Sequence, residues 1–535
     1  MMRFLPVSLT SLLVELPTRE ETSSLFSALQ AAALPGMKEI IPAARTLLIS
    51  FAPHETSAIM LARQINQLNL HTIISHTYHC VEIAVDYDGE DLPDVAELTG
   101  LSVADIIKHH TDAEYTVAFC GFAPGFGYLT GGNAALQVPR RTTPRTRIPA
   151  GAVALAGGFT GVYPQASPGG WQIIGRTTLK MWDLGRTPPA LFQPGYHVRF
   201  FDRAKAGRDF HIPPPAAPTP AAPTTVASAG GFMVTTSPLP ALFQDLGRFG
   251  QTGQGVSSSG AMDRGALKAA NRVVGNPETE PCLEIAGGGF AFRSLERTVI
   301  GFTGAPCGLR IRTAEGQTRS PDFYAPIALE VDDVVTLTPP LAGARSYMSV
   351  RGGFDICTPL GSAATDTLAG IGPEPVRVGD WIKLKGAGNC QPVSLSEAPA
   401  FSFPRAGEIV TLDVVLGPRA DWFTPESLAI FSDTSWTVTP QSNRVGIRLD
   451  APTSLARIST AELPSEGCVA GALEVPPDGK PLLLLADHPL TGGYPVIGAV
   501  AGYHLDLAGQ IPIGAKIRFR PLASFAEITP QPETA

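Results

Sequence analysis

Residues 150–175 read AGAVALAGGFTGVYPQASPGGWQIIG. Its first block, AGAVAL (150–155), resembles AGALEV (470–475), and its last block, GGWQIIG (169–175), resembles GGYPVIG (492–498). Further along, PGYHVRF (194–200) resembles IPIGAKIRF (511–519). The blocks have the short, apolar character of strands and are separated by glycine and proline turns. Three matches in one order, at similar spacing, indicate a duplicated module. The sequence therefore predicts two related β-barrels, one in each half of the chain.

The segment before the first repeat has a different pattern. Two strands are predicted at 10–16 and 46–51, and two helices with apolar residues at helical spacing are predicted near 25–33 and 61–68. Further along, residues 213–230 consist mainly of Pro, Ala and Thr, which predicts an extended, semi-rigid linker. The predicted fold class is therefore mainly β with α/β parts, with a small N-terminal α/β lobe and duplicated barrels.

These patterns predict six segments along the chain. A length of 535 residues is sufficient for several separate cores. The segments are an α/β lobe (1–79), a first barrel (80–203), the linker (204–230), a further β domain (231–395), a second barrel (396–525) and a tail (526–535).

The composition excludes several classes of protein. Hydrophobic residues make up 44% and charged residues 16%, as in globular rather than disordered chains. With a net charge of −8 the chain offers no basic face for nucleic acid, and no apolar run approaches the roughly 18 residues of a membrane span. The seven cysteines are scattered without metal-ligand spacing, so we expect reduced thiols, no metal site and a cytoplasmic location.

Two regions of the first half are candidates for ligand binding. Four arginines within 140–147 offer guanidinium groups, which match carboxylate and phosphate oxygens bidentately. A turn at 167–171 joins a hydroxyl, two glycines and an indole, a combination that suits the wall of a small pocket. The structural alternatives are a solvated basic rim for the arginines and a plain turn for 167–171.

The second half offers a comparable set of candidates. Glu284 lies on a predicted strand ahead of three glycines, where a carboxylate beside bare backbone can act as general acid, general base or amide ligand. Asp263 opens a predicted helix, so it either binds a ligand or complements the helix dipole. Gln244, Asp245 and Arg248 also lie beside glycines. Each of these residues has a structural alternative as a turn residue or a satisfied buried group.

Longer motifs around these residues resemble two known families. FCGFAPGFGYL (119–129) and VYPQASPGGWQIIGRT (162–177) resemble allophanate hydrolase subunit 1. QDLGRFGQTGQGVSSSGAMD (244–263), RSYMSVRGGFD (345–355) and TGGYPVIGAV (491–500) resemble allophanate hydrolase subunit 2. Both families are similar to the B and C subunits of prokaryotic 5-oxoprolinase, to the carboxyltransferase region of urea carboxylase, and to a sporulation-kinase inhibitor with its antagonist.

This resemblance implies cyclophilin-like barrels and a fused B–C component of an ATP-dependent 5-oxoprolinase. Such a protein would open 5-oxoproline to L-glutamate together with a separate A-like subunit, using ATP and Mg²⁺. A lactam is a poor electrophile until its oxygen is phosphorylated, and cationic groups would then stabilise the developing charge. We therefore assign catalysis to Arg145, Arg248 and Glu284. The residues assigned to substrate binding are Arg140, Ser167, Gly169, Gly170, Trp171, Gln244, Asp245, Asp263, Arg345, Thr491, Gly492, Gly493 and Tyr494.

Two other functions stay open. A carboxyltransferase that acts on a urea-like amide would need biotin, carried by another chain because no biotin-attachment setting occurs here. A regulatory binding protein that inhibits a kinase or sequesters a ligand would need no second substrate. The sequence departs from the family pattern at Ala152, Ala363, Ala364, Glu474 and Pro489. The polar groups lost at these positions favour the regulatory alternative.

Overall fold

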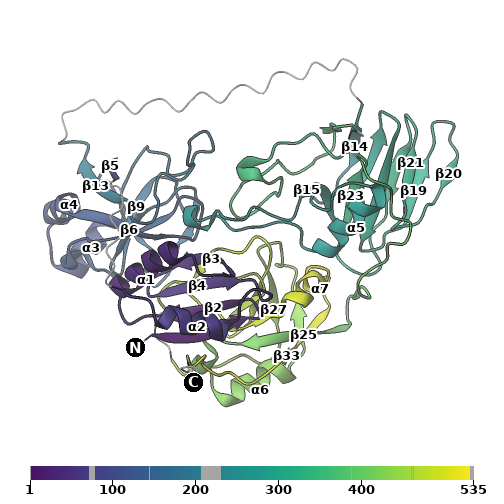
Figure 1. Ribbon diagram of the computed structural model, residues 1–535. Coiled ribbons are helices and arrows are strands. Elements are labelled where there is room, and N and C mark those ends of the chain that lie inside the picture. Colours follow the sequence, from purple (N-terminus) through teal and green to yellow (C-terminus); the bar gives the residue numbers. More distant parts are fainter. Residues whose placement is uncertain are drawn as a thin grey trace.

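The computed structural model describes residues 2–70, 79–143, 145–205, 230–386, 388, 390–459, 461 and 463–530. Strands predominate, and they form a small N-terminal sheet, two barrels and a sandwich (Figure 1). Most of the predicted linker at 204–230 and the last five residues of the predicted tail lie outside the described residues. The predicted segment boundaries remain a proposal.

The N-terminal lobe is a four-stranded antiparallel sheet in the order β1-β2-β4-β3, with two helices packed on it. The predicted strands at 10–16 and 46–51 are confirmed as β2 and β4. Leu25 of the first helix and Ile65 of the second are fully buried in one apolar core with the sheet, as their helical spacing predicts. The elements are β1 (Arg3–Ser8), β2 (Ser11–Glu15), α1 (Arg19–Ala32), β3 (Met37–Pro42), β4 (Thr46–Phe51) and α2 (Ala58–Asn66).

The first barrel is a seven-stranded sheet in the order β12-β9-β10-β7-β6-β13-β5. The β13 and β5 strands pair in parallel, and a bridge between Asp86 and Arg176 brings the two edges of the sheet together. Two helices follow β5. The elements are β5 (Cys80–Val85), α3 (Leu92–Thr99), α4 (Val103–Asp112), β6 (Glu114–Cys120), β7 (Gly127–Thr130), β9 (Ala152–Ala156), β10 (Phe159–Val162), β12 (Gln172–Arg176) and β13 (His197–Asp202).

The second barrel is closed and has the same connectivity. Its order β25-β33-β26-β27-β30-β29-β32 matches β5-β13-β6-β7-β10-β9-β12 strand for strand, including the single parallel pair. The predicted duplication is therefore confirmed at the level of topology. The elements are β25 (Ile409–Leu416), α6 (Pro425–Asp433), β26 (Trp436–Val438), β27 (Gly446–Asp450), β29 (Ala472–Glu474), β30 (Leu482–Leu484), β32 (Val496–Val500), α7 (Leu505–Gly509) and β33 (Lys516–Pro521).

Between the barrels in sequence lies a sandwich of two sheets around a shared apolar core. The six-stranded sheet contains β20 (Thr318–Arg319), β19 (Leu309–Arg312), β22 (Val334–Leu337), β17 (Ala291–Ser294), β14 (Phe232–Thr236) and β24 (Trp381–Ile382). The five-stranded sheet contains β15 (Ala241–Gln244), β16 (Cys282–Ala286), β23 (Arg345–Val350), β18 (Thr298–Gly304) and β21 (Ile327–Leu329), with α5 (Arg264–Val274) packed on it.

Each half of the chain reaches across to the barrel of the other half. The N-terminal lobe lies against the second barrel (Figure 1), where buried Arg419 donates to Glu15 of β2 at 3.1 Å. In the opposite direction, a short helical turn, η2 (Thr252–Gln254), packs on the first barrel. The backbone N–H of Gly125 donates to the carbonyl of Gln254 at 2.9 Å. These crossed contacts hold the two barrels next to each other.

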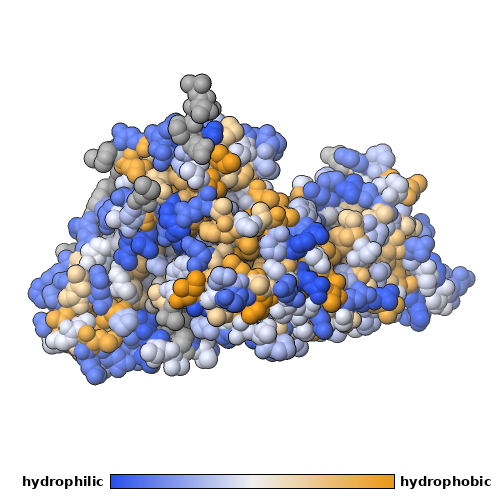
Figure 2. Space-filling model, turned by 90° about the horizontal axis from the view of Figure 1, so that it is seen from below, coloured by the Kyte–Doolittle hydropathy of each residue, from blue (hydrophilic) through white to orange (hydrophobic). Residues whose placement is uncertain are grey.

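The surface is mixed in character. On the face shown in Figure 2, hydrophilic residues surround smaller groups of hydrophobic ones, which is ordinary for protein surfaces. Within the described ranges, no helix has the length and apolar character that spanning a membrane would require.

Candidate functional site

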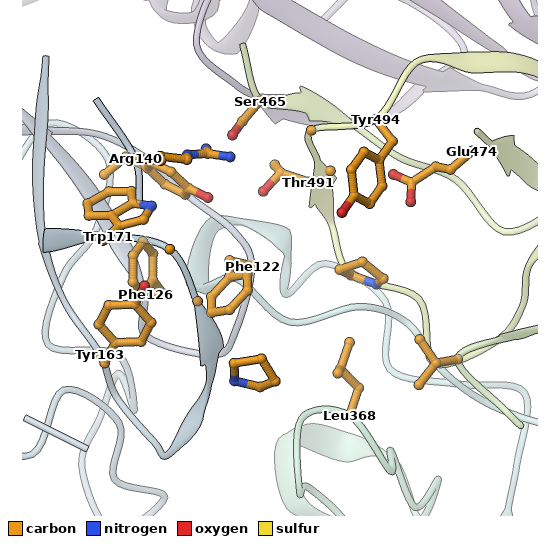
Figure 3. Close-up of a pocket in the computed structure, with 18 of the residues that line it drawn as sticks. Phe122, Phe126, Arg140, Tyr163, Trp171, Leu368, Ser465, Glu474, Thr491 and Tyr494 are labelled. Atoms are coloured by element: carbon orange, nitrogen blue, oxygen red, sulfur yellow. The ribbon is translucent and has the colours of Figure 1, made fainter. Parts of the chain in front are cut away.

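A cavity of about 430 Å³ lies between the two barrels and is lined by both (Figure 3). This volume is within the usual range for small-molecule sites. The first barrel contributes Phe122, Phe126, Tyr128, Arg140, Arg141, Tyr163, Pro168, Gly169, Gly170 and Trp171. The second half contributes Leu368, Val445, Ser465, Glu474, Pro489, Thr491, Gly492, Gly493 and Tyr494.

The cavity is built around one structural feature that occurs twice. In the first barrel, β8 (Arg145–Ile148) and β11 (Ser167–Gly169) form a two-stranded ribbon, and Trp171 follows the Gly-Gly pair at its end. In the second, β28 (Glu466–Gly467) and β31 (Thr491–Gly492) form the equivalent ribbon, followed by Tyr494. The two repeated Gly-Gly-aromatic turns therefore meet at a single site.

Aromatic rings form the first-barrel wall of the cavity. Phe126 packs edge-on against Tyr163 and Trp171, with ring centroids 5.3 and 5.4 Å apart, and Tyr128 lies 5.6 Å from Trp171. These four residues are buried in one cluster. Edge-to-face aromatic pairs are a favourable, largely apolar arrangement, so this wall offers an apolar surface to a small ring.

Two glycines allow the close approach that shapes the site. A Cβ at Gly121 of the first barrel would collide with the hydroxyl of Thr491 in the second. A Cβ at Gly492 would collide with the carboxyl of Glu474. A side chain at either position would displace these neighbours, so glycine is needed for the packing rather than for a turn.

Polar groups at the cavity are few. Arg140 extends toward Ser465 and Thr491 of the second half (Figure 3), and a Cβ on Gly493 would lie 3.7 Å from its Nη1. Glu474 is 5% exposed, and its Oε1 accepts a hydrogen bond from the Cys468 thiol, with Sγ 3.5 Å away. Burial raises the pKa of Glu474 to about 7. The cavity thus combines two arginines, Arg140 and the Asp91-paired Arg141, with one carboxyl group whose pKa is raised toward neutral pH.

The arginines at 140–147 have different surroundings in the structure. Asp91, almost fully buried, accepts bidentately from Arg145 at 2.9 and 2.7 Å and also from Arg141 at 2.5 Å. The second oxygen of Asp91 accepts from the backbone N–H of Ile173 at 2.7 Å. Arg145 therefore anchors the ribbon to β12 and is absent from the cavity lining, whereas Arg140 lines the cavity.

Glu284 lies in a buried ion network between the sandwich and the second barrel. It is 3% exposed and accepts from Arg444 Nη1 at 2.6 Å, from the Tyr347 hydroxyl at 2.7 Å and from the Met262 N–H at 3.0 Å. Arg444 also donates two bonds to Asp487, both at 2.9 Å. This network joins the sandwich to the second barrel, and Glu284 does not line the cavity.

Asp263 and Arg345 belong to the same junction. Asp263 caps α5 by accepting from the Ala266 N–H at 2.8 Å, and its other oxygen accepts from Gln510 Nε2 at 2.9 Å. Burial raises the pKa of Asp263 to about 7. Arg345 donates to the carbonyl of Gly509. Both side chains are occupied with protein contacts outside the cavity.

Gln244, Asp245 and Arg248 hold the loop at 361–366. Asp245 accepts from the Ser362 hydroxyl at 2.7 Å and from the Ala363 N–H at 2.8 Å, and Gln244 donates to the Thr365 carbonyl at 2.8 Å. Arg248, 2% exposed, donates to the Ala364 carbonyl. Among the described residues, its Nε and Nη1 have no hydrogen-bond partner, and burial lowers its pKa.

Eight of the predicted site residues meet at the cavity and the others do not. Those that line it are Arg140, Gly169, Gly170, Trp171, Thr491, Gly492, Gly493 and Tyr494. Outside it are Arg145, Ser167, Gln244, Asp245, Arg248, Asp263, Glu284 and Arg345. The roles predicted for both groups stay predictions, because position alone does not test them.

Sequence reasoning identified Trp171 but missed Glu474 and the other three rings of the aromatic wall, Phe126, Tyr128 and Tyr163. Phe126 and Tyr128 lie in the FCGFAPGFGYL motif and Tyr163 lies in VYPQASPGGWQIIGRT, so the aromatic residues of these two motifs were a usable signal. Glu474 also had a signal, because it aligns with Ala154 when AGAVAL is matched to AGALEV. An acid in place of a buried alanine at a repeated strand position indicates a special environment.

Comparison with known proteins identifies the class. The family described as carboxyltransferase domain, subdomain C and D, matches residues 2–192, and that described as carboxyltransferase domain, subdomain A and B, matches residues 254–521. The chain belongs to the carboxyltransferase-domain family.

Individual relatives each match one half of the chain. The C subunit of 5-oxoprolinase from Escherichia coli is 32% identical over 279 residues, covering 52% of this chain and 86% of that protein. The B subunit of 5-oxoprolinase from Bacillus subtilis is 45% identical over 134 residues, covering 24% of this chain and 55% of that protein. The urea amidolyase of Saccharomyces cerevisiae is 31% identical over 297 residues, covering 52% of this chain but 16% of its own length.

A solved structure matches both halves at once. The crystal structure of TTHA0988 is 31% identical, with a TM-score of 0.78, and the match covers 95% of this chain and 99% of that one. The arrangement of lobe, barrels and sandwich in one chain is therefore shared with a protein of known structure.

Proposed function

We propose that this chain is the fused B–C component of an ATP-dependent 5-oxoprolinase, which opens 5-oxoproline to L-glutamate together with a separate A-like subunit. Its halves are similar to the B and C subunits, which supports a common task. The observation that carries the proposal is a cavity of about 430 Å³ that both halves line. A ligand held there would contact the B-like and the C-like barrel together, so fusion of the two subunits would keep one site intact.

The chemistry of the cavity suits a small lactam acid. The aromatic wall can stack against a five-membered ring, and Arg140 can pair with its carboxylate. The lactam carbonyl becomes electrophilic when its oxygen is phosphorylated, and a guanidinium nearby stabilises the charge that develops. In this proposal Arg140 holds the carboxylate at the cavity, and the roles predicted for Arg145, Arg248 and Glu284 remain predictions about residues outside it.

The remaining parts of the proposal concern the complex. ATP, as its Mg²⁺ salt, would be the cosubstrate that supplies the phosphoryl group, and the A-like subunit would complete the active assembly. We keep a cytoplasmic location as part of the proposal. Phosphoryl transfer would leave ADP. One water would then add at the activated carbonyl carbon as the ring nitrogen leaves as the amine of glutamate, and a second water would release phosphate.

Two alternatives compete with this function. Similarity to urea amidolyase favours a carboxyltransferase that uses biotin carried by another chain. The largely apolar lining and the alanines at Ala363 and Ala364 favour a regulatory protein that binds a ligand without turning it over. Each alternative predicts that no glutamate is formed from 5-oxoproline.

The test is glutamate release from 5-oxoproline and ATP by the full chain, with and without the A-like subunit from the same source. Glutamate formed only by the mixture would support the proposal. If the mixture forms none, although the A-like subunit is active with its usual B and C partners, the 5-oxoprolinase assignment is wrong. Carboxybiotin consumption with urea would then support the first alternative.

A further inference from the structure

We propose that Glu474 recognises the amide edge of a lactam in its protonated form, donating its O–H to the lactam carbonyl and accepting from the ring N–H. This inference rests on the proposed function for the lactam itself. It adds a specificity-determining residue, and with it a dependence of ligand binding on pH. None of the residues predicted from sequence performs this task.

The position of Glu474 supports direct contact with a ligand. It ends β29, between Leu482 of β30 and Val496 of β32, and its carboxyl lies on the cavity wall. In Figure 3 it lies on the same side as Thr491 and Tyr494, across the cavity from Trp171. A ring stacked on the aromatic wall could therefore present its far edge to Glu474.

The charged and titratable groups around Glu474 leave its carboxyl without a counter-ion. Cys468 contacts Oε1, and burial raises the pKa of that thiol well above its usual value, so it stays neutral. Arg457 donates to the carbonyl of Val475, and Tyr494 lines the cavity nearby. Arg140 extends from the opposite barrel. Within the described residues, no Lys, Arg or His forms an ion pair with Glu474.

This environment favours the neutral acid near physiological pH. A buried carboxylate without a basic partner is poorly solvated, so protonation is favoured, and burial raises the pKa of Glu474 to about 7. A protonated carboxyl group carries one O–H donor and one carbonyl acceptor side by side. An ionised one carries acceptors only.

Complementarity then depends on the ligand's amide. A lactam ring forces its amide to be cis, so N–H and C=O lie on one edge and match a protonated acid through two parallel hydrogen bonds. An ionised Glu474 would instead place a carboxylate oxygen against the lactam oxygen. Urea has an edge with two N–H donors, which matches the ionised form. Lactam and urea-like ligands should therefore show opposite pH dependence.

The test measures binding by the full chain, without turnover, by calorimetry between pH 6 and 9. The ligands are 5-oxoproline, 2-pyrrolidinone (which lacks the carboxylate) and urea, and the proteins are wild type, Glu474→Gln and Cys468→Ala. We expect wild-type lactam affinity to fall by about tenfold per pH unit above the Glu474 pKa, for one linked proton. Glu474→Gln keeps a donor and an acceptor, so its lactam affinity should be independent of pH. Cys468→Ala keeps the Glu474 carboxyl, so its lactam affinity should still fall as the pH rises.

The outcomes separate this inference from the proposed function. Three results would overturn the role of Glu474. They are a wild-type lactam affinity that does not change with pH, a fall in lactam affinity that persists in a folded Glu474→Gln protein, and no lactam binding at all. Urea binding that strengthens with pH, with no lactam binding, would overturn it in favour of a urea-like ligand. If lactam binding follows the expected pattern but no glutamate is formed in the presence of the A-like subunit, the proposed activity fails and the role of Glu474 stands.

Discussion

Trp171 and Tyr494 occupy equivalent positions in the two halves of the chain and line the same cavity. Each follows a Gly-Gly pair beside a two-stranded ribbon of its own barrel. Their environments differ, since Trp171 is 5% exposed within the aromatic wall and Tyr494 is 44% exposed. One copy of the repeated turn thus packs the wall, while the other stays accessible to a ligand.

This difference predicts opposite phenotypes for the two aromatic residues. Trp171→Ala should destabilise the chain by about 3–5 kcal/mol, the usual cost of truncating a buried tryptophan. Tyr494→Ala should leave thermal unfolding almost unchanged and weaken lactam binding. Unfolding curves and calorimetric titrations of both variants check this, and equal destabilisation by the two changes would contradict it.

Arg140→Ala should reduce glutamate formation by the complex by about 10²-fold, because loss of the guanidinium that holds the carboxylate would misplace the lactam. The variant should also weaken binding of 5-oxoproline more than binding of 2-pyrrolidinone, because only the former has a carboxylate. Arg176→Ala is the matched control, since that arginine is exposed on β12 and pairs with Asp88 at 3.0 Å. Similar losses in both variants would exclude a specific role for Arg140.

Gly121→Ala should disturb the site through the contact between barrels. The new Cβ would collide with Thr491, so one barrel must shift relative to the other. We expect weaker ligand binding and a lower unfolding temperature. Gly253→Ala is the control, because nothing lies within 4 Å of a Cβ placed there. If Gly121→Ala binds lactam like wild type, the close approach is not needed for the site.

Glu474 should make stability depend on pH. Its pKa is about 7 in the folded chain against a usual 4.5, so the folded state binds more protons between these values. The contribution of Glu474 to the free energy of unfolding is therefore fully present below about pH 4.5. It is lost as the pH rises through 7, which lowers the free energy of unfolding by up to about 3 kcal/mol. Glu474→Gln should consequently stabilise the chain more at pH 8 than at pH 5. Unfolding temperatures of both proteins at both pH values test this, and an unchanged difference would disprove it.

Arg444→Ala should be strongly destabilising. It would leave Glu284 and Asp487 buried without their shared cation, and breaking a buried pair in this way costs about 3–5 kcal/mol. Arg448→Ala, exposed on the neighbouring strand β27, should change stability by less than about 0.5 kcal/mol. Denaturant unfolding distinguishes the two, and a mild effect at Arg444 would mean that the network contributes little.

Part of the site was predictable because it repeats. The Gly-Gly-aromatic turns were visible as GGWQIIG and GGYPVIG, and the strand order of the two barrels follows from the same duplication. The arginines at 140–147 were recognisable as a group, but their division was not. Asp91, which accepts hydrogen bonds from Arg141 and Arg145, lies about 50 residues earlier in the chain.

The sequence by itself determined the duplicated barrel, the N-terminal α/β lobe and the family, because these depend on local patterns of apolar residues, glycine turns and long motifs. Only the tertiary structure decided that Arg140 and Glu474 line one cavity, whereas Glu284 is neutralised by Arg444 in a separate network. The physical reason is that the role of a charged side chain depends on its burial and its nearest partner. Both are set by packing between segments far apart in the chain.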